Sequence, residues 1–159
     1  LLLLNAKQAL RREDRTIGGE VIAILGMTLT APAAYYVARG VWDATAWWLW
    51  ALCALYFTSS VFYVKLRVYS MNKRKAAARR QSQLLCALYH AFLLAALIAF
   101  SATGSLNLFA LIAFAPVLVR SFWQLAWPAP ELDLLRIGMS EIIYSVVFLV
   151  FITMTFRFA

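Results

Sequence analysis

Six polar or ionisable residues lie at the edges of long apolar segments or inside them, and they are the candidates for chemistry: Glu20, Tyr63, Lys65, Arg67, His90 and Glu141. Ionisable groups are costly to place in hydrocarbon, so they usually face a protein interior or water and indicate a functional site. The set contains two carboxylates together with basic and phenolic side chains. We therefore predict that these six residues line one polar cavity that binds a lipid-like or anionic ligand.

Each charged residue also has a simpler interpretation when it is taken alone. Glu20 and Glu141 lie at predicted helix N-termini, where the helix dipole favours a carboxylate by ~0.3 to 1 kcal/mol. Lys65, Arg67 and Arg120 close predicted helices and can extend to the lipid headgroups without any other role. Only their joint placement at one depth favours a shared site, because a buried carboxylate needs a partner.

His90 is the single histidine, and it lies roughly 9 Å inside its predicted helix. It could bond a neighbouring helix, ligate a haem or chlorophyll, or relay protons. The first of these is the leading interpretation, because polar side chains commonly bond between membrane helices. The sequence has no phosphate-binding glycine loop, HExxH, GxSxG or CxxC motif. We therefore predict no metal site and assign no cofactor and no catalytic residue.

The elements that position these residues follow from the composition. The chain is 64% hydrophobic and 14% charged, whereas soluble domains are roughly a quarter charged. A spanning helix needs about 20 apolar residues, and five segments qualify: residues 21–38, 45–64, 84–102, 106–121 and 138–156. We predict an all-α, polytopic membrane helix bundle that forms one domain over residues 1–159.

Three local features refine this prediction. Pro32 and Pro116 should bend their helices, because each removes a backbone donor. Residues 1–4 are all leucine, and we expect them to be the end of a helix that lies upstream. Cys53 and Cys86 fall at opposite depths of different helices, so they should not form a disulfide.

The distribution of basic residues predicts the orientation. Thirteen of the 15 Lys and Arg residues fall on one side of the five-helix topology, and that side is cytoplasmic by the positive-inside rule. The N-terminal stretch and the basic loop 65–80 are thus predicted to be cytoplasmic, and the C-terminus to lie on the opposite side. The net charge of +8 has this origin, so membrane lipids rather than nucleic acid are the expected partners.

Three blocks of the sequence resemble one family. They are RREDRTIGGEVIAILGMTLTAPAAYYVA at 11–38, FTSSVFYVKLRV at 57–68 and RIGMSEIIYSVVFLVF at 136–151, and together they resemble the YwiC-like bacterial membrane proteins. The resemblance implies a multi-pass protein of the bacterial cytoplasmic (inner) membrane and carries no biochemical activity with it. Members of that family have further helices upstream, including a His-Gly-Ala-Trp block, so we expect this chain to be a piece that lacks them.

Two other functions stay open as alternatives. The small-residue faces AALIAFSATGS and APAAYYVA suit helix contacts, which favours an accessory transmembrane subunit of a respiratory or photosynthetic complex. The arrangement also distantly resembles UbiA-type prenyltransferases, which bind a magnesium diphosphate through paired aspartate-rich motifs. Glu13, Asp14 and Glu20 lack that DxxxD spacing, so we do not assign this activity.

Overall fold

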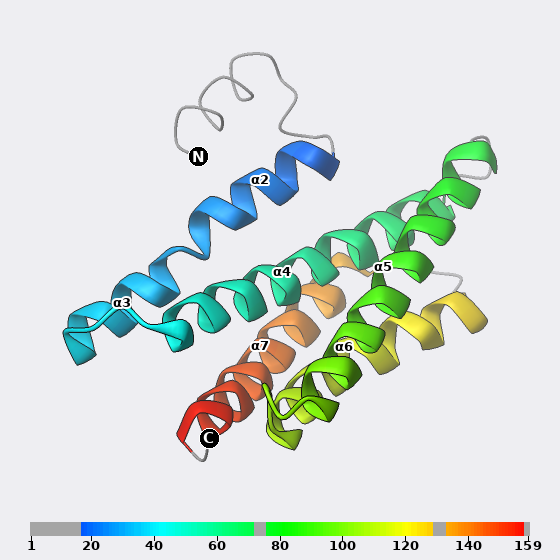
Figure 1. Cartoon of the computed structure of the whole chain (residues 1–159). Coiled ribbons are helices and arrows are strands. Elements are labelled where there is room, and N and C mark those ends of the chain that lie inside the picture. The colour runs from blue at the N-terminus through cyan, green and yellow to red at the C-terminus, as the bar shows by residue number, and fades with distance from the viewer. Residues whose placement is uncertain (1–16, 72–75, 129–132, 158–159) are drawn as a thin grey trace. The chain divides into compact units, whose positions relative to one another are not determined.

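The computed structural model describes residues 17–71, 76–128 and 133–157. Helices account for most of them, and no strand occurs among them. The helices are α2 (Ile17–Met27), α3 (Thr30–Arg39), α4 (Ala44–Met71), α5 (Ala76–Ala102), α6 (Leu108–Ala126) and α7 (Leu134–Arg157) (Figure 1). Within these described ranges, five helical stretches, α2 and α3 being counted together, are long and apolar enough to cross a membrane. The predicted all-α class is confirmed, and the helices fit a multi-pass integral membrane protein.

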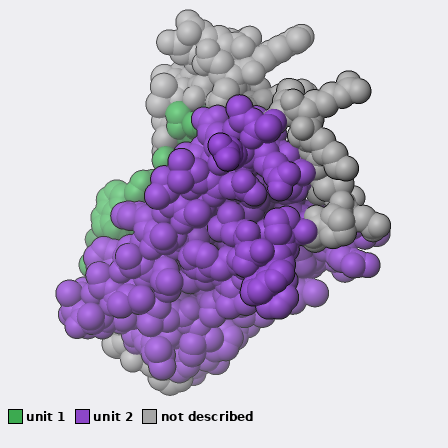
Figure 2. Space-filling view, turned by 90° about the vertical axis from the view of Figure 1, so that its right-hand side faces the viewer, with its two compact units in different colours: residues 1–61 green, residues 62–159 purple. Residues whose placement is uncertain are grey.

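The chain divides into two compact units. Unit 1 comprises residues 1–61 and unit 2 residues 62–159, drawn in green and purple in Figure 2. Helix α4 contributes residues 44–61 to unit 1 and its last residues to unit 2. The prediction of one transmembrane domain over residues 1–159 stays a prediction.

In unit 1, the helix predicted over 21–38 is interrupted between α2 and α3, one turn before Pro32. A proline ring clashes with the carbonyl four residues earlier, which here belongs to Thr28. The Leu29 amide accordingly bonds a carbonyl three residues back, at 3.3 Å. The Leu25 carbonyl thereby loses its usual helical partner, and the Trp50 indole of α4 donates a hydrogen bond to it at 3.1 Å. One proline thus explains both the break and this contact with α4.

The turn from α3 to α4 is defined by two end residues. Gly40 has a φ of 70°, a left-handed conformation that glycine adopts without strain, and its amide donates to the Tyr36 carbonyl at 2.8 Å. Asp43 precedes α4, and its carboxylate accepts from the Thr45 amide at 2.8 Å, as an N-cap residue does. The Tyr35 hydroxyl donates to the same carboxylate at 2.9 Å. These bonds lower the pKa of Asp43, the Tyr35 bond being the largest cause.

Unit 2 is built around α6, which packs against both α5 and α7. The buried residues of each helix recur at helical spacing, which gives each helix one inward face. The rings of Phe114 and Phe148 meet edge to face in the α6–α7 interface, with centroids 5.3 Å apart. The buried residues are Ser82, Cys86, His90, Leu93 and Leu97 on α5, and Ala110, Ala113, Phe114, Val117, Leu118, Ser121 and Gln124 on α6.

Several predicted helix boundaries are wrong. Helix α4 runs on to Met71 and α5 already begins at Ala76, so most of the predicted basic loop 65–80 is helical. The predicted bounds followed apolarity alone, whereas Lys, Arg and Ala are good helix formers outside the hydrocarbon as well. Glu141 was expected in the first turn of its helix, yet α7 begins at Leu134. Glu141 therefore lies roughly 10 Å along the helix axis, where the N-terminal dipole no longer explains it.

Candidate functional site

An ion pair joins the two helices that follow each other at the C-terminal end of unit 2. Arg120 of α6 donates through Nη1 to Oε1 of Glu141 on α7. Their side chains are only 8% and 22% exposed, so neither group extends freely into solvent. The simpler interpretation of Arg120, as a helix end that extends to the headgroups without another role, does not fit, because α6 continues to Ala126 and the guanidinium is buried.

Two tyrosines of other helices surround the Arg120 guanidinium. Its central carbon lies 3.9 Å from the ring centroid of Tyr63 on α4 and 5.1 Å from that of Tyr144 on α7. A cation over an aromatic face gains about 0.5 to 2 kcal/mol, the larger value where water is excluded. Arg120 is thus held by groups from α4 and α7.

A second buried arginine lies beside this pair. Arg67 of α4 donates through Nη1 to the Gln124 amide oxygen of α6 at 3.1 Å, and both residues are 6% exposed. The simpler interpretation of Arg67, as a residue that extends to the headgroups, therefore does not fit either. Gln124 lies four residues after Arg120, one helical turn away on the same face. The two bonded pairs consequently form one polar cluster, defined by Tyr63, Arg67, Arg120, Gln124, Glu141 and Tyr144.

The polar cluster holds donors that the rest of the described chain does not satisfy. Arg120 Nε, Arg120 Nη2 and Gln124 Nε2 are buried, and no hydrogen-bond partner for them occurs among the described residues. A buried polar group without a partner costs about 1 to 3 kcal/mol, more when it is charged. Native proteins retain few such groups, so three in one cluster indicate that these N–H groups have a function.

A cavity of about 480 Å³ opens beside these donors. Within unit 2 the cluster contributes two guanidinium groups and one carboxylate, and the carboxylate is paired with Arg120. The cavity is partly open rather than enclosed. Its lining comes from α4, α6 and α7: Tyr63, Ala115, Pro116, Val119, Arg120, Trp123, Gln124 and Tyr144.

The structure brings together three of the six residues predicted to form the site. Tyr63 contacts Arg120, Arg67 bonds Gln124, and Glu141 pairs with Arg120. Of these three, only Tyr63 is in the cavity lining; Arg67, Glu141 and the half-buried Lys65 lie outside it. Glu20 lies in the first turn of α2, as expected; it belongs to unit 1, and its part in the site stays a prediction.

His90 is fully buried in α5 and lies outside the cavity lining. Its Nδ1 donates to the Cys86 carbonyl one turn earlier at 2.8 Å, since a carbonyl can only accept. Its ring meets Phe122 of α6 edge to face, with centroids 6.3 Å apart. These contacts give His90 a packing role between α5 and α6. Haem or pigment ligation by His90 stays a prediction.

Arg120, Gln124 and Tyr144 were missed as site residues. The signal was present as helical spacing: Tyr63 and Arg67 are four residues apart, as are Arg120 and Gln124, while Glu141 and Tyr144 are three apart. Each pair therefore lies on one helix face. Three polar pairs inside apolar segments indicate three polar faces, and such faces avoid lipid by meeting one another.

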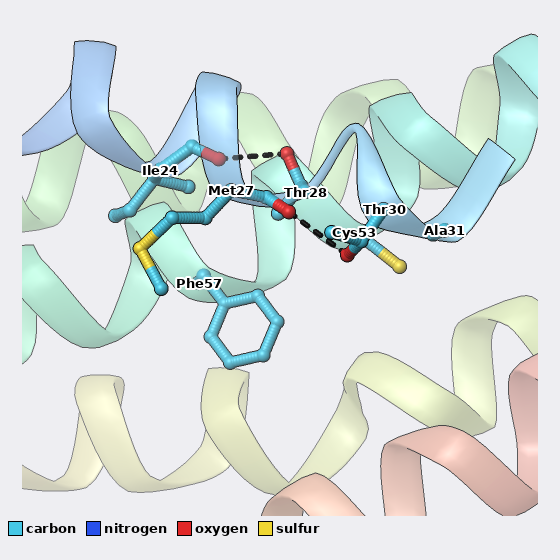
Figure 3. A pocket seen from close by; sticks show the side chains of 7 residues that line it. All are labelled: Ile24, Met27, Thr28, Thr30, Ala31, Cys53 and Phe57. Atoms are coloured by element: carbon cyan, nitrogen blue, oxygen red, sulfur yellow. Dashed lines mark hydrogen bonds between the residues drawn. The ribbon is translucent and has the colours of Figure 1, made fainter. Parts of the chain in front are cut away.

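Unit 1 contains a separate cavity of about 330 Å³ at the interruption between α2 and α3. Figure 3 shows that its threonine hydroxyls are engaged with backbone: Thr28 donates to the Ile24 carbonyl at 2.8 Å and Thr30 to the Met27 carbonyl at 2.9 Å. The rest of the lining is mainly apolar, with the Cys53 thiol as its one other polar group. The lining residues are Ile24, Met27, Thr28, Thr30, Ala31, Cys53 and Phe57.

The described helices fit an integral membrane protein, and its second unit holds a cavity lined in part by Arg120 and Gln124 of the polar cluster. No family model matches the chain, and neither a curated protein nor a solved structure matches it. Over the described ranges, no group of three or more His, Cys, Asp or Glu side chains is placed to hold a metal ion. The chemistry of the cavity must therefore be argued from its own residues.

Proposed function

We propose that this chain is a multi-pass protein of the bacterial inner membrane that binds an anionic ligand in the cavity of the polar cluster. The observation that carries the proposal is the set of buried, unsatisfied donors: Arg120 Nε, Arg120 Nη2 and Gln124 Nε2 beside the cavity. A ligand with acceptor oxygens would satisfy them.

The geometry of the donors favours a phosphate or carboxylate group. A guanidinium presents its N–H groups as a planar fork that matches two oxygens of such an anion. Glu141 occupies one side of that fork through Nη1, which leaves Nε and Nη2 for a ligand. Arg67 donates to the Gln124 oxygen and so leaves the Gln124 amide N–H groups for a ligand. The low-dielectric surroundings strengthen the attraction of the Arg120 charge for an anion.

The bacterial location, the YwiC-like family and the cytoplasmic placement of the N-terminal stretch are part of the same proposal. They are supported by the three sequence blocks and by the bias in Lys and Arg. Function as an accessory subunit stays an alternative and the prenyltransferase activity stays unassigned, since no described contact favours either of them.

Thermal unfolding in an uncharged detergent tests the proposed function. Decyl phosphate or decyl maltoside is added at equal concentration, which keeps the chain constant while the headgroup charge changes. A ligand that binds only the folded state raises the melting temperature, with about 2.7 kcal/mol of stabilisation at 100 times its Kd. We expect decyl phosphate to stabilise the protein more than decyl maltoside does.

Two arginine variants localise the effect. Arg120→Gln removes the guanidinium of the polar cluster, whereas Arg136→Gln removes an equal charge from an arginine of α7 whose side chain is 87% exposed. The additional stabilisation by decyl phosphate should disappear in R120Q and persist in R136Q. Equal stabilisation of both variants would refute anion binding at the polar cluster.

A further inference from the structure

An apolar groove of about 640 Å³ adjoins the cavity of the polar cluster. Both hollows share Ala115, Val119 and Trp123, which follow one another at intervals of four residues along α6. They therefore meet along one stripe of that helix. Ala115 has the shortest side chain of the three residues in this stripe. The remaining residues of the groove are Leu94 of α5 and Leu111, Leu118, Phe122, Ala126 and Trp127 at or near α6.

Two tryptophans mark the depth of the cavity in a membrane. Trp123 and Trp127 lie at the end of α6 with ring centroids 4.8 Å apart, and their residues are 63% and 65% exposed. Exposed indoles prefer the headgroup level of a bilayer. Arg120 precedes Trp123 by three residues, or roughly 5 Å along the helix. The unsatisfied donors are thus at the depth where lipid headgroups lie.

The length of the groove matches one leaflet. Leu111 and Trp123 are both in its lining and are twelve residues apart, which is roughly 18 Å of helix. Half of a hydrocarbon core of about 30 Å is close to that length. A chain that starts at the level of Trp123 and follows the groove would therefore reach the middle of the bilayer.

We infer that the ligand is an anionic phospholipid, with its phosphate at Arg120 and Gln124 and one acyl chain in the groove. This inference rests on the proposed function, because it assigns a tail to the anion that the polar cluster binds. A free anion would use the donors alone and leave the groove to the bulk lipid. A phospholipid uses both hollows, which share Ala115, Val119 and Trp123 in their linings.

Quenching of tryptophan fluorescence tests where the chain lies. The protein is reconstituted in two preparations of phosphatidylcholine vesicles. One contains a small fraction of brominated phosphatidylglycerol, and the other contains the same fraction of brominated phosphatidylcholine. One basic side chain near the surface enriches an anionic lipid roughly fivefold. Brominated phosphatidylglycerol should therefore quench more strongly than brominated phosphatidylcholine, and the double variant Trp123→Phe/Trp127→Phe should lose that excess.

The same arginine variants assign the excess quenching to the polar cluster. The excess quenching should persist in R136Q and vanish in R120Q. If R120Q does not fold, the variant Gln124→Leu is used in its place. Equal quenching by the two brominated lipids in the wild-type protein would overturn the inference. The decyl phosphate experiment distinguishes failure of this inference from failure of the proposed function. If brominated lipids quench equally but decyl phosphate still stabilises the protein through Arg120, only the acyl chain in the groove is refuted. If that stabilisation is absent as well, anion binding at the polar cluster is refuted too.

Discussion

Replacing Glu141 with glutamine removes the charge that compensates the buried Arg120 guanidinium. Breaking a buried ion pair from one side costs about 3 to 5 kcal/mol. Glu141 is less buried than Arg120, and glutamine retains an oxygen that can accept the bond from Nη1. We therefore expect the lower end of that range, about 3 kcal/mol. At roughly 2 to 4 °C per kcal/mol for a chain of this size, the melting temperature should fall by about 6 to 12 °C.

A double-mutant cycle assigns this loss to the pair itself. Arg120→Gln alone leaves a partly buried carboxylate, whereas the double variant R120Q/E141Q leaves two neutral amides that can bond each other. The double variant should be more stable than the sum of the single effects predicts, with a coupling energy of about 2 to 3 kcal/mol. The buried Cys86 thiol gives the readout, because a thiol-reactive dye labels it when the protein unfolds.

Two outcomes would refute this reasoning. A melting temperature of E141Q within about 1 °C of the wild type would mean that Arg120 is compensated without Glu141. Strictly additive effects in the cycle would mean that the two residues act independently. A related gain is expected at the same time: decyl phosphate should stabilise E141Q more than the wild type, because the negative carboxylate beside the guanidinium no longer repels the bound anion.

Three further predictions concern the rest of the chain. Gln124→Leu removes the acceptor that Arg67 Nη1 uses and should cost about 1.5 to 3 kcal/mol, measured by the same thermal assay, while Gln124→Glu keeps an acceptor and should retain most of the stability. Asp43→Ala should lower the melting temperature more than Asp43→Asn, which can still cap α4. The pKa of Asp43 is lowered in the folded protein. Its stabilising contribution is therefore present above the unfolded pKa of about 3.9 and is lost as the pH falls through the folded pKa. A difference in melting temperature between the wild type and D43N that does not change with pH in an acid titration would contradict this. Alkaline phosphatase fused within 103–107 should be active and the same enzyme fused within 65–80 inactive, and the reverse pattern would refute the predicted orientation.

Much of the fold could be predicted from the sequence because the hydrocarbon requirement is severe. A run of about 20 apolar residues has few other uses, so the five spans were found, and Pro32 indicated the interruption of the first one. The helix ends were placed poorly because apolarity ends at the headgroups, whereas backbone hydrogen bonding continues through Lys65 and Arg67 to Met71.

The site was predicted in part for a related reason. Tyr63, Arg67 and Glu141 were found because polar residues inside spans are uncommon. Arg120 was interpreted as a helix end, since an arginine lowers the apparent apolarity of its surroundings and the predicted helix stopped at residue 121. Its burial depends on the packing of α6 against α7 and on contacts with Tyr63. Such contacts between distant residues are not visible in the local pattern of a single sequence.

Native mass spectrometry of the protein released directly from its membrane tests the central claim most directly. It reports which lipids remain on the folded chain without any choice of probe. The wild type and R136Q should each retain one bound anionic phospholipid, and R120Q should have lost it. An R120Q variant that is folded and retains the same lipid as the wild type would contradict the assignment of the polar cluster as an anionic lipid site.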